Sequence, residues 1–337
     1  MQAWTTTGPG SLAIVEVDEP RPEPGEAVVA VEAFSPNRGE SFLLERAEPG
    51  FRPGKDIAGT VVRAAASGRG PRIGTRVVAH LDHSGWAERV AVNVDRLAEI
   101  PKAISHTTAA ALPLAGLTAL RLTRVTGPLA SRRVLMTGAS GGVGHYFVEL
   151  AASQGAQITV VSATEQRSRR LLELGASNWV TDPVETTGRF DIGLDSVGGP
   201  TTASVFTKLT DHGLLIWFGQ ASRTAPTLDF FDWSGGLSAT IRKFSYTDSD
   251  VPVADDLATL VCLTATGHLH PEIGLVADWR QTPQVIETMV ERTVRGNAVL
   301  TIPSPHASQP DRHANGCQEG THREQRQRPQ ARPPALP

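Results

Sequence analysis

The sequence predicts an α/β protein that combines a β-rich domain with a doubly wound parallel sheet. Two observations predict this fold class. Short apolar runs punctuated by Gly and Pro fill residues 1 to about 113, which is typical of a small barrel or sandwich. From about Thr107 onward, strand-like and helix-like segments alternate, as they do in a doubly wound sheet. The length of 337 residues is sufficient for two such domains.

The strands of the β-rich part are predicted from apolar runs between turn signals. The run Val28-Val29-Ala30-Val31 follows the turn signal Pro22-Glu23-Pro24-Gly25, and similar runs are bounded by Pro53-Gly54 and by Gly74. Because Gly and Pro interrupt regular structure, each run is short enough for a single strand. We expect strands at residues 28–31, 57–62 and 76–79.

The elements of the second part are predicted from a change in the spacing of apolar residues. The segment 107–124 is rich in Ala and Leu and long enough for a helix, despite Pro113 and Gly116. After it, continuous apolar runs alternate with segments of helical spacing. We expect strands at 133–137, 158–161, 190–194, 214–218, 273–276 and 299–302, and helices at 143–154, 165–174, 255–265 and 283–292.

Composition excludes several classes of function. The 32 Lys and Arg against 35 Asp and Glu give a net charge of −3, so the chain lacks the basic face that nucleic-acid binding needs. The two cysteines, Cys262 and Cys317, provide neither a disulfide framework nor a four-thiolate zinc site. No run of about 18 apolar residues predicts a membrane span, and the first residues show no signal peptide. We therefore expect a cytoplasmic protein with no nucleic-acid or membrane partner.

The last residues, 304–337, differ in composition from the rest. They are rich in Pro, Gln, Arg and His and carry almost no large apolar side chain. Such a segment buries too little apolar surface to offset the entropy of ordering. We predict that 304–337 is a disordered tail.

The strongest motif is the glycine-rich segment Gly138-Ala139-Ser140-Gly141-Gly142-Val143-Gly144, which follows a predicted strand and opens a predicted helix. In that setting Gly141 and Gly142 would let backbone N–H groups approach a pyrophosphate, and Gly144 would let the helix pack closely on the strand. The helix N-terminus adds partial positive charge. We predict a dinucleotide site at residues 139–144; the alternative is a glycine-rich turn without a ligand.

The end of the next predicted strand indicates which dinucleotide binds. A site specific for NAD carries an acidic residue about 20 residues after the motif, at the tip of the second strand. Here the strand ends in Ser162-Ala163-Thr164, and Arg167 follows in the next turn. A hydroxyl and a cation suit the 2′-phosphate of NADPH, so Ser162 and Arg167 are predicted cofactor residues. The alternative is that Arg167 is a solvated helix residue and Glu165 binds the ribose.

Several segments together resemble one family, the zinc-free medium-chain dehydrogenases/reductases of the quinone oxidoreductase group. Each occurs in the order in which the family carries it. They are Pro53-Gly54-Lys55-Asp56-Ile57-Ala58-Gly59, Gly85-Trp86-Ala87-Glu88-Arg89-Val90, Leu112-Pro113-Leu114-Ala115-Gly116-Leu117-Thr118-Ala119, the motif at 139–144, the stretch 190–199, and Arg295-Gly296-Asn297-Ala298-Val299-Leu300. The resemblance covers residues 1 to about 303.

The resemblance implies a fold and a reaction. A GroES-like domain would consist of residues 1–118 and 267–303, and a Rossmann NADP-binding domain would consist of residues 119–266. Such enzymes transfer hydride from NADPH to a quinone or to a conjugated carbonyl, as in enoyl reductases. A small-molecule substrate and a homodimer are implied as well.

The resemblance also bears on metal. Zinc members of the superfamily place Cys and His ligands in the barrel domain, and here those positions fall near Asn37 and at Lys55. Both zinc sites are therefore predicted to be absent. The pair in His80-Leu81-Asp82-His83 is interpreted as an ordinary loop, because it has no thiolate partner.

Without a metal, polar groups in the cleft must polarise the carbonyl. Asn37 is the first candidate, because the family carries an active-site polar residue there, and Lys55 is the second. The alternative for Lys55 is a surface residue paired with Asp56 or Glu40. Many quinone reductases carry a Tyr after the Asn, but residues 41–50 contain none. The proton donor is therefore open between solvent, a cofactor hydroxyl and Lys55.

Two further positions and one cluster are candidates for the site. Asp195 is interpreted as structural or as lying near the nicotinamide ribose, and Gly219 as giving close approach to the nicotinamide at a strand end. The aromatic residues Phe230, Phe231, Trp233 and Phe244 would form a substrate wall, a dimer contact or simply core. Two other functions compete with the reductase. They are a zinc-type alcohol dehydrogenase and an NADPH-binding structural or sensor protein without turnover.

Overall fold

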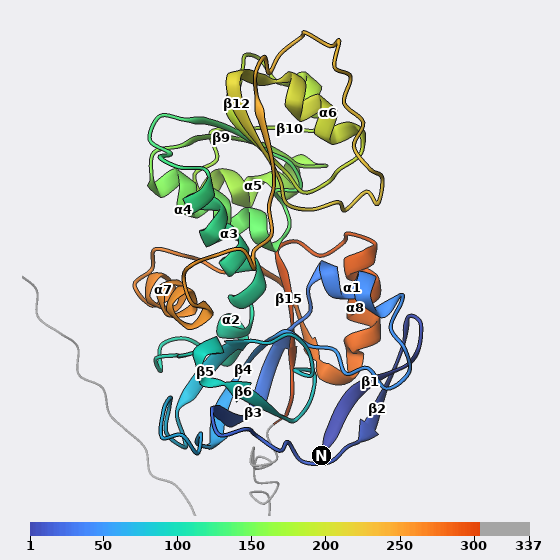
Figure 1. The fold of residues 1–337 in the computed structure, drawn as a ribbon, viewed down its shortest axis with the longest axis vertical. Coiled ribbons are helices and arrows are strands. Elements are labelled where there is room, and N and C mark those ends of the chain that lie inside the picture. The colour runs from blue at the N-terminus through green and yellow to red at the C-terminus, as the bar shows by residue number, and fades with distance from the viewer. Residues whose placement is uncertain (304–337) are drawn as a thin grey trace, which may run out of the picture. The chain divides into compact units, whose positions relative to one another are not determined.

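A mostly antiparallel sheet and a parallel sheet form the framework of the computed structural model (Figure 1). The structure describes residues 1–303, and the predicted tail at 304–337 lies outside the described residues. The predicted fold class is confirmed: a β-rich domain is combined with a doubly wound α/β domain.

The first sheet draws its strands from both ends of the described chain. In spatial order it contains β14 (Ile273–Asp278), β15 (Asn297–Thr301), β3 (Glu26–Ser35), β4 (Asp56–Arg63), β5 (Arg76–His80) and β7 (Leu97–Glu99), and β6 (Arg89–Asn93) also pairs with β3. Antiparallel pairing of β15 with β3 brings Leu300 opposite Phe34. The late strands β14 and β15 thus complete a sheet whose other strands come from the first hundred residues. The exact domain boundaries stay predictions.

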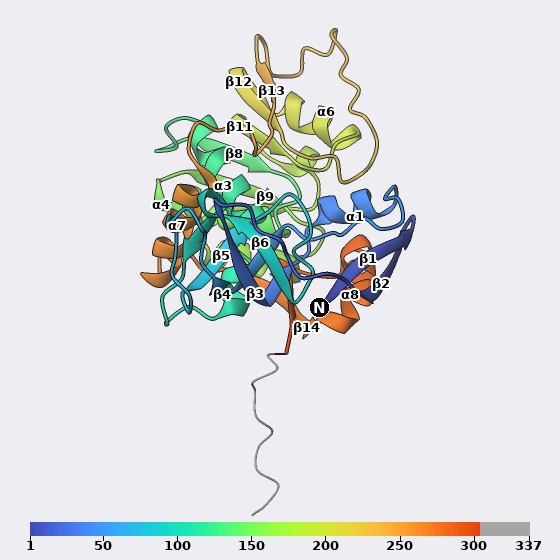
Figure 2. The ribbon, with the colours of Figure 1, turned by 60° about the horizontal axis from the view of Figure 1, so that its bottom comes forward.

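The core of this domain is aromatic and aliphatic. Phe34 stacks on Trp86 with ring centroids 5.6 Å apart, and both side chains are fully buried. The hairpin of β1 (Gln2–Gly8) and β2 (Ser11–Glu16) closes one side, where Trp4 Nε1 donates to the carbonyl oxygen of Trp279. Next to the hairpin lie α1 (Arg38–Leu44) and α8 (Thr282–Val290), which contact each other (Figure 2).

The second sheet is parallel throughout. Its order is β10 (Asn178–Val180), β9 (Gln157–Val161), β8 (Arg133–Met136), β11 (Phe190–Asp195), β12 (Leu209–Trp217) and β13 (Thr240–Lys243). The helices that connect these strands include α4 (Gly142–Ser153), α5 (Glu165–Glu173) and α6 (Pro200–Thr207). Because the chain runs outward from β8 to β10 and then returns to β11, the strand order reverses between β8 and β11. Ligands of doubly wound sheets bind at such a reversal.

The predicted helix at 107–124 is wrong as a single element. The structure divides it into α2 (His106–Ala110) and α3 (Pro113–Val125). Pro113 is the first residue of α3, where its missing N–H costs no helical hydrogen bond, and Ser105 caps α2 by accepting from the N–H of Thr108. Three short 3₁₀ helices occur at Val94–Arg96, Pro183–Glu185 and Trp279–Gln281.

The helix α7 (Val253–Ala265) packs against α3 and β7 (Figure 1). A Cβ on Gly116 of α3 would lie 2.9 Å from a methyl of Leu260, so glycine lets these two helices approach closely. The helix α7 thus contacts the antiparallel sheet through β7 as well as contacting α3. None of the helices within residues 1–303 is long and apolar enough to cross a membrane.

The aromatic cluster divides in two. Phe230, Phe231 and Trp233 lie after β12 with 78%, 76% and 62% of their surface exposed, whereas Phe244 is buried. The core interpretation is therefore wrong for the first three, which contact one another instead. It is correct for Phe244, because that side chain is buried and packs in the largest apolar cluster.

Candidate functional site

The glycine-rich turn joins β8 to α4 at the reversal of the strand order. A Cβ on Gly144 would overlap the carbonyl oxygen of Ala139, and one on Gly142 would overlap Asn297. Gly138 adopts a φ of +62°, in the left-handed region that favours glycine. Packing within the protein therefore explains the glycines at 138, 142 and 144. The close packing of α4 that was expected at Gly144 is confirmed, because the backbone of Ala139 leaves no room for a Cβ there.

Gly141 differs from these three. A Cβ there would meet only the carbonyl oxygen of Gly138, at 3.5 Å, which is ordinary contact. Gly141 is also the N-cap of α4, and it has no side chain to cap the first-turn N–H groups of that twelve-residue helix. The protein itself does not require glycine at this position. A ligand that approaches the backbone would require it.

A late segment of the chain lies against this turn. The N–H of Gly296 donates to the carbonyl oxygen of Ser140 over 3.1 Å, and Gly141 forms an isolated bridge with Gly296. Gly296 has a φ of +68°, and a Cβ on it would overlap the carbonyl oxygen of Glu272. The segment from Arg292 to Gly296 is thus one wall of the predicted cofactor site. No spacing in the sequence indicates this neighbour of the turn.

Ser162 and Arg167 lie where the sequence analysis expects them, after the carboxyl end of β9. Ser162 is almost fully buried, and its hydroxyl donates to the carbonyl oxygen of Thr164 over 3.4 Å. The Nη2 of Arg167 donates to the carbonyl oxygens of Arg292 and Val294 over 2.6 and 3.0 Å. Arg167 is therefore not a free, solvated side chain. It ties α5 to the late segment that covers the glycine-rich turn.

A group of arginines gathers beside this segment. Arg292 donates to the carbonyl oxygen of Ala221, and Arg38 donates to the carbonyl oxygen of Met289. Burial lowers the pKa of Arg38, and the nearby positive charges of Arg292 and Arg223 lower it further. Of these three cations, Arg223 has a carboxylate partner, Glu45. The arrangement favours an anionic ligand.

Asp195 and Gly219 have contacts within the protein that account for both residues. Asp195 is fully buried, and its carboxylate oxygens accept from four donors: the hydroxyls of Thr137 and Thr202 and the N–H groups of Val197 and Gly198. These contacts favour the structural alternative for Asp195. A Cβ on Gly219 would lie 2.9 Å from the carbonyl oxygen of Ser196, so the neighbouring backbone explains this glycine.

The neighbouring strands β3, β4 and β5 bring a second group of polar side chains together. Asp56 begins β4, opposite Ser35 near the end of β3 and opposite His80 at the end of β5. The Nδ2 of Asn37 donates to Asp56 Oδ2 over 2.7 Å, and the N–H of Leu114, in the first turn of α3, donates to the same oxygen over 2.9 Å. Asn37 is buried, and its amide is directed at Asp56.

His80 extends this cluster to Tyr246. The Nδ1 of His80 lies 2.7 Å from Asp56 Oδ1, and its Nε2 lies 3.2 Å from the Tyr246 hydroxyl. His80 and Asp56 are both almost inaccessible, whereas Tyr246 is half-buried. Burial, together with the negative charge of Asp56, raises the pKa of Tyr246 to about 12, so the phenol is protonated at neutral pH.

The interpretation of residues 80–83 as an ordinary loop is wrong for His80, which is the last residue of β5. The other two polar residues of that stretch have separate partners: Asp82 pairs with Arg96 over 2.7 Å, and His83 contacts the hydroxyl of Ser84. One signal in the sequence was available, because the apolar run before His80 predicts a buried strand end.

Lys55 is half-buried next to the cluster. Within residues 1–303 it has no ion-pair partner inside 4.0 Å, so the pairing with Asp56 or Glu40 is not seen. Asp56 is already engaged by Asn37, His80 and Leu114. The charge of Lys55 nevertheless acts on Glu40, whose pKa it lowers in part. Lys55 is thus a cation available to a ligand.

Glu40 is a buried carboxyl that accepts from the N–H of Asn37 over 2.8 Å. Burial, reinforced by the negative charge of Asp56, raises its pKa to about 8. Between pH values of about 4.5 and 8 the folded chain therefore holds a proton that the unfolded chain has released, and stability falls as the pH rises through that window.

Glu40→Gln should remove this decline. The variant is expected to gain a few kcal/mol of stability over the parent above pH 8, and less at lower pH, because glutamine stays neutral. Urea unfolding near pH 5 and near pH 9 measures the difference. The exposed Glu99 provides the control, Glu99→Gln, for which no such change is expected. A Glu40→Gln effect that is the same at both pH values would contradict the assignment.

The resemblance implies that the zinc-ligand positions of related dehydrogenases fall near Asn37 and at Lys55. Among residues 1–303, no group of three or more His, Cys, Asp or Glu side chains is arranged to hold a metal ion. An amide and an ammonium are poor zinc ligands. The residues at this place therefore do not fit a zinc site.

Known proteins resemble this chain over most of its length. A family model described as zinc-binding dehydrogenase matches residues 174–300. Human mitochondrial NAD(P)H oxidoreductase RTN4IP1 is 31% identical over 301 residues, which cover 79% of this chain and 72% of the human protein. A mycocerosic acid synthase-like polyketide synthase of Mycolicibacterium smegmatis is 28% identical over 319 residues, which cover 89% of this chain and 15% of the synthase.

Solved structures share the fold. The Escherichia coli quinone oxidoreductase, described as complexed with NADPH, aligns with a TM-score of 0.81 at 22% identity and covers 89% of this chain and 100% of its own. At that identity the likeness shows the architecture alone. Together with the identity to the human oxidoreductase, these findings confirm the family: the chain is an oxidoreductase of the medium-chain dehydrogenase/reductase family and belongs to its quinone oxidoreductase group.

Proposed function

We propose that this protein is an NADPH-dependent reductase that transfers hydride to a quinone or to an α,β-unsaturated carbonyl without using zinc. The observation that carries the proposal is the open backbone at Gly141, at the reversal of the strand order. Related proteins support the choice of cofactor, because their descriptions include an NAD(P)H oxidoreductase and a quinone oxidoreductase complexed with NADPH. A cytoplasmic homodimer acting on a small molecule belongs to the same proposal.

The residues at the site fit a dinucleotide. The N–H groups at 139–144 and the start of α4 would hold the pyrophosphate, and Ser162 and Arg167 would hold the 2′-phosphate. The cations Arg38 and Arg292 would offset the phosphate charge. When bound, NADPH supplies the hydride. The chain itself supplies the binding, the orientation and the groups that handle charge and protons.

Lys55 is the group best suited to polarise the acceptor. Hydride addition to a conjugated carbonyl leaves negative charge on the oxygen, which a nearby ammonium stabilises. Asn37 was the first candidate for this role, but its Nδ2 donates to Asp56 and, at 3.4 Å, to the carbonyl oxygen of Ser35. We therefore propose that Lys55 contacts the acceptor oxygen and that Asn37 orients Asp56.

Turnover by the full chain tests the function. NADPH oxidation, followed by absorbance, is measured with a quinone and with a simple enone, and NADH is compared at the same concentration. We expect oxidation of NADPH with at least one acceptor. Tight NADPH binding with no oxidation across both acceptor classes would contradict the reductase and favour a sensor role.

Arg167→Ala tests the assignment of the 2′-phosphate. The variant is expected to weaken NADPH binding by about tenfold or more and to change NADH binding little, because only NADPH carries the phosphate that the guanidinium contacts. Arg169→Ala, on the exposed side of the same helix, is the matched control. Arg167 also ties down the segment 292–294, so equal losses for both cofactors would show a structural role instead.

A further inference from the structure

We propose that Tyr246 delivers the proton that completes the reduction, and that His80 and Asp56 resupply it. The proposal rests on the proposed function, and it fills the place of the proton donor that the sequence leaves open. Residues 41–50 contain no Tyr. The structure brings one to the same cluster from a segment about 200 residues later in the chain.

The geometry is that of a hydrogen-bonded relay with one accessible end. Asp56, His80 and Tyr246 follow one another through contacts of 2.7 and 3.2 Å. The inner two residues are almost completely buried, and Tyr246 is the member that solvent or substrate can reach. Asn37 contacts the inner end of this relay, because its Nδ2 donates to Asp56. Asp56 is also the sequence neighbour of Lys55, the group that we propose to contact the acceptor, so the relay and Lys55 belong to one cluster.

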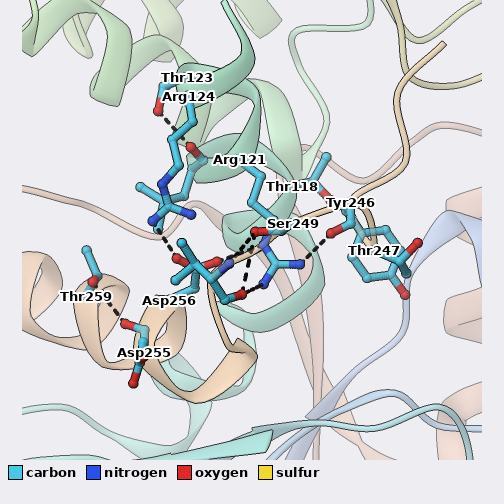
Figure 3. A network of polar contacts seen from close by, with 12 residues as sticks. Thr118, Arg121, Thr123, Arg124, Tyr246, Thr247, Ser249, Asp255, Asp256 and Thr259 are labelled. Carbon is cyan, nitrogen blue, oxygen red and sulfur yellow. Dashed lines mark hydrogen bonds and ion pairs between the residues drawn. The ribbon is translucent and has the colours of Figure 1, made fainter.

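The backbone of Tyr246 is held by a buried ion pair (Figure 3). Arg121 of α3 donates from Nη1 to the carbonyl oxygen of Tyr246 over 2.5 Å and from Nη2 to that of Val251 over 3.1 Å. Its Nε pairs with Asp256 of α7 over 2.7 Å, and Asp256 is fully buried. Arg124 contacts the other oxygen of Asp256. A loop residue is thereby fixed by two helices, as proton delivery to a defined atom requires.

The proton balance of the step is complete. Because Asp56 accepts from Nδ1–H, Nε2 of His80 faces the phenol oxygen. Hydride from NADPH forms the new C–H bond at the β-carbon, and the electron pair of the double bond moves toward the carbonyl. Tyr246 gives its proton to the resulting anion, and the phenolate recovers a proton through its contact with Nε2 of His80. Solvent then restores the relay through the accessible phenol.

Charged groups around the phenol are consistent with this direction of transfer. Burial raises the pKa of Tyr246. Asp56, Asp82 and Glu40 raise it further and Arg96 lowers it, and the net effect keeps the phenol protonated between turnovers. A phenolate formed in the step is therefore driven to recover its proton quickly. The nearest source is His80.

Tyr246→Phe removes the hydroxyl alone, and the test uses the full chain. We expect unchanged NADPH binding, a fall of about 100-fold in turnover of the enone, and a smaller fall with the quinone, because oxygen anions take protons from water readily. The solvent deuterium isotope effect should rise as proton transfer becomes limiting. The chain has one other tyrosine, and its variant Tyr146→Phe is the control, because that buried hydroxyl donates to the carbonyl oxygen of Ala111.

Each outcome bears on a different part of the proposal. The role of Tyr246 would be overturned if the wild-type chain reduced the enone and Tyr246→Phe did so at the same rate. It would also be overturned if Tyr246→Phe lost enone and quinone turnover equally, with no change in the solvent isotope effect. A His80→Gln variant that folds and turns over like wild type would overturn the resupply step. A wild-type chain that binds NADPH but reduces neither acceptor would remove the proposed function and the proton step with it.

Discussion

Gly141→Val is expected to lose NADPH binding by at least about 100-fold, or roughly 3 kcal/mol, while the chain stays folded. The chain is expected to stay folded because the added Cβ meets no protein atom closer than ordinary contact. It projects from the N-cap of α4, where first-turn N–H groups would otherwise contact a phosphate. Calorimetric titration with NADPH, together with a thermal unfolding curve for each protein, measures the two effects separately.

Gly144→Val is the matched control for this variant. There the Cβ would overlap the carbonyl oxygen of Ala139, so the helix must move away from the turn and the fold itself is destabilised. We expect a lower unfolding temperature for Gly144→Val and a nearly unchanged one for Gly141→Val. Unchanged NADPH affinity in folded Gly141→Val would show that the glycine-rich turn does not hold the cofactor.

Asp256→Asn is expected to cost about 3–5 kcal/mol of stability, the largest loss predicted for any single side chain of this protein. Asp256 is fully buried and accepts from both Arg121 and Arg124. Removing its charge leaves the buried guanidinium of Arg121 without a counter-ion. An unpaired buried charge destabilises a protein far more than replacing the whole ion pair by apolar side chains does. Urea denaturation at neutral pH gives the change in the free energy of unfolding.

The neighbouring Asp255 serves as the comparison, because it is the same residue type on the same helix but is exposed. Asp255→Asn should change stability by less than about 0.5 kcal/mol. If Asp256→Asn were equally mild, Arg121 would not be held by the ion pair. Arg121 also anchors the carbonyl oxygen of Tyr246, so a folded Asp256→Asn protein should turn over the enone more slowly as well.

The sequence predicted the parallel half of the fold well, because its signals are local. The apolar run of β8, the glycines after it and the helical spacing of α4 occur within about twenty residues, and each reports on its own neighbours. Short or polar elements escaped detection. The strand β13 is exposed along its whole length, and α6 is only eight residues long, so neither has an apolar periodicity to detect.

Only those parts of the candidate site that lie within one continuous stretch of the chain were predicted from the sequence. Positions 139–144 and 162–167 follow β8 and β9 in the structure, and their role in cofactor binding stays a prediction. Contacts such as that of His80 with Tyr246, 166 residues apart, depend on how two domains meet, and no local pattern encodes that meeting. The partners of Arg167 are backbone carbonyl oxygens, which every residue possesses and which a sequence therefore cannot single out.

A titration of the full chain with NADPH and with NADH tests the central claim most directly. Binding of one cofactor per chain, with NADPH preferred, is the result expected from the open turn at Gly141 and the cation at Arg167. A preference for NADH would contradict the assignment of the 2′-phosphate. Failure to bind either cofactor would contradict the proposal that this chain is a reductase.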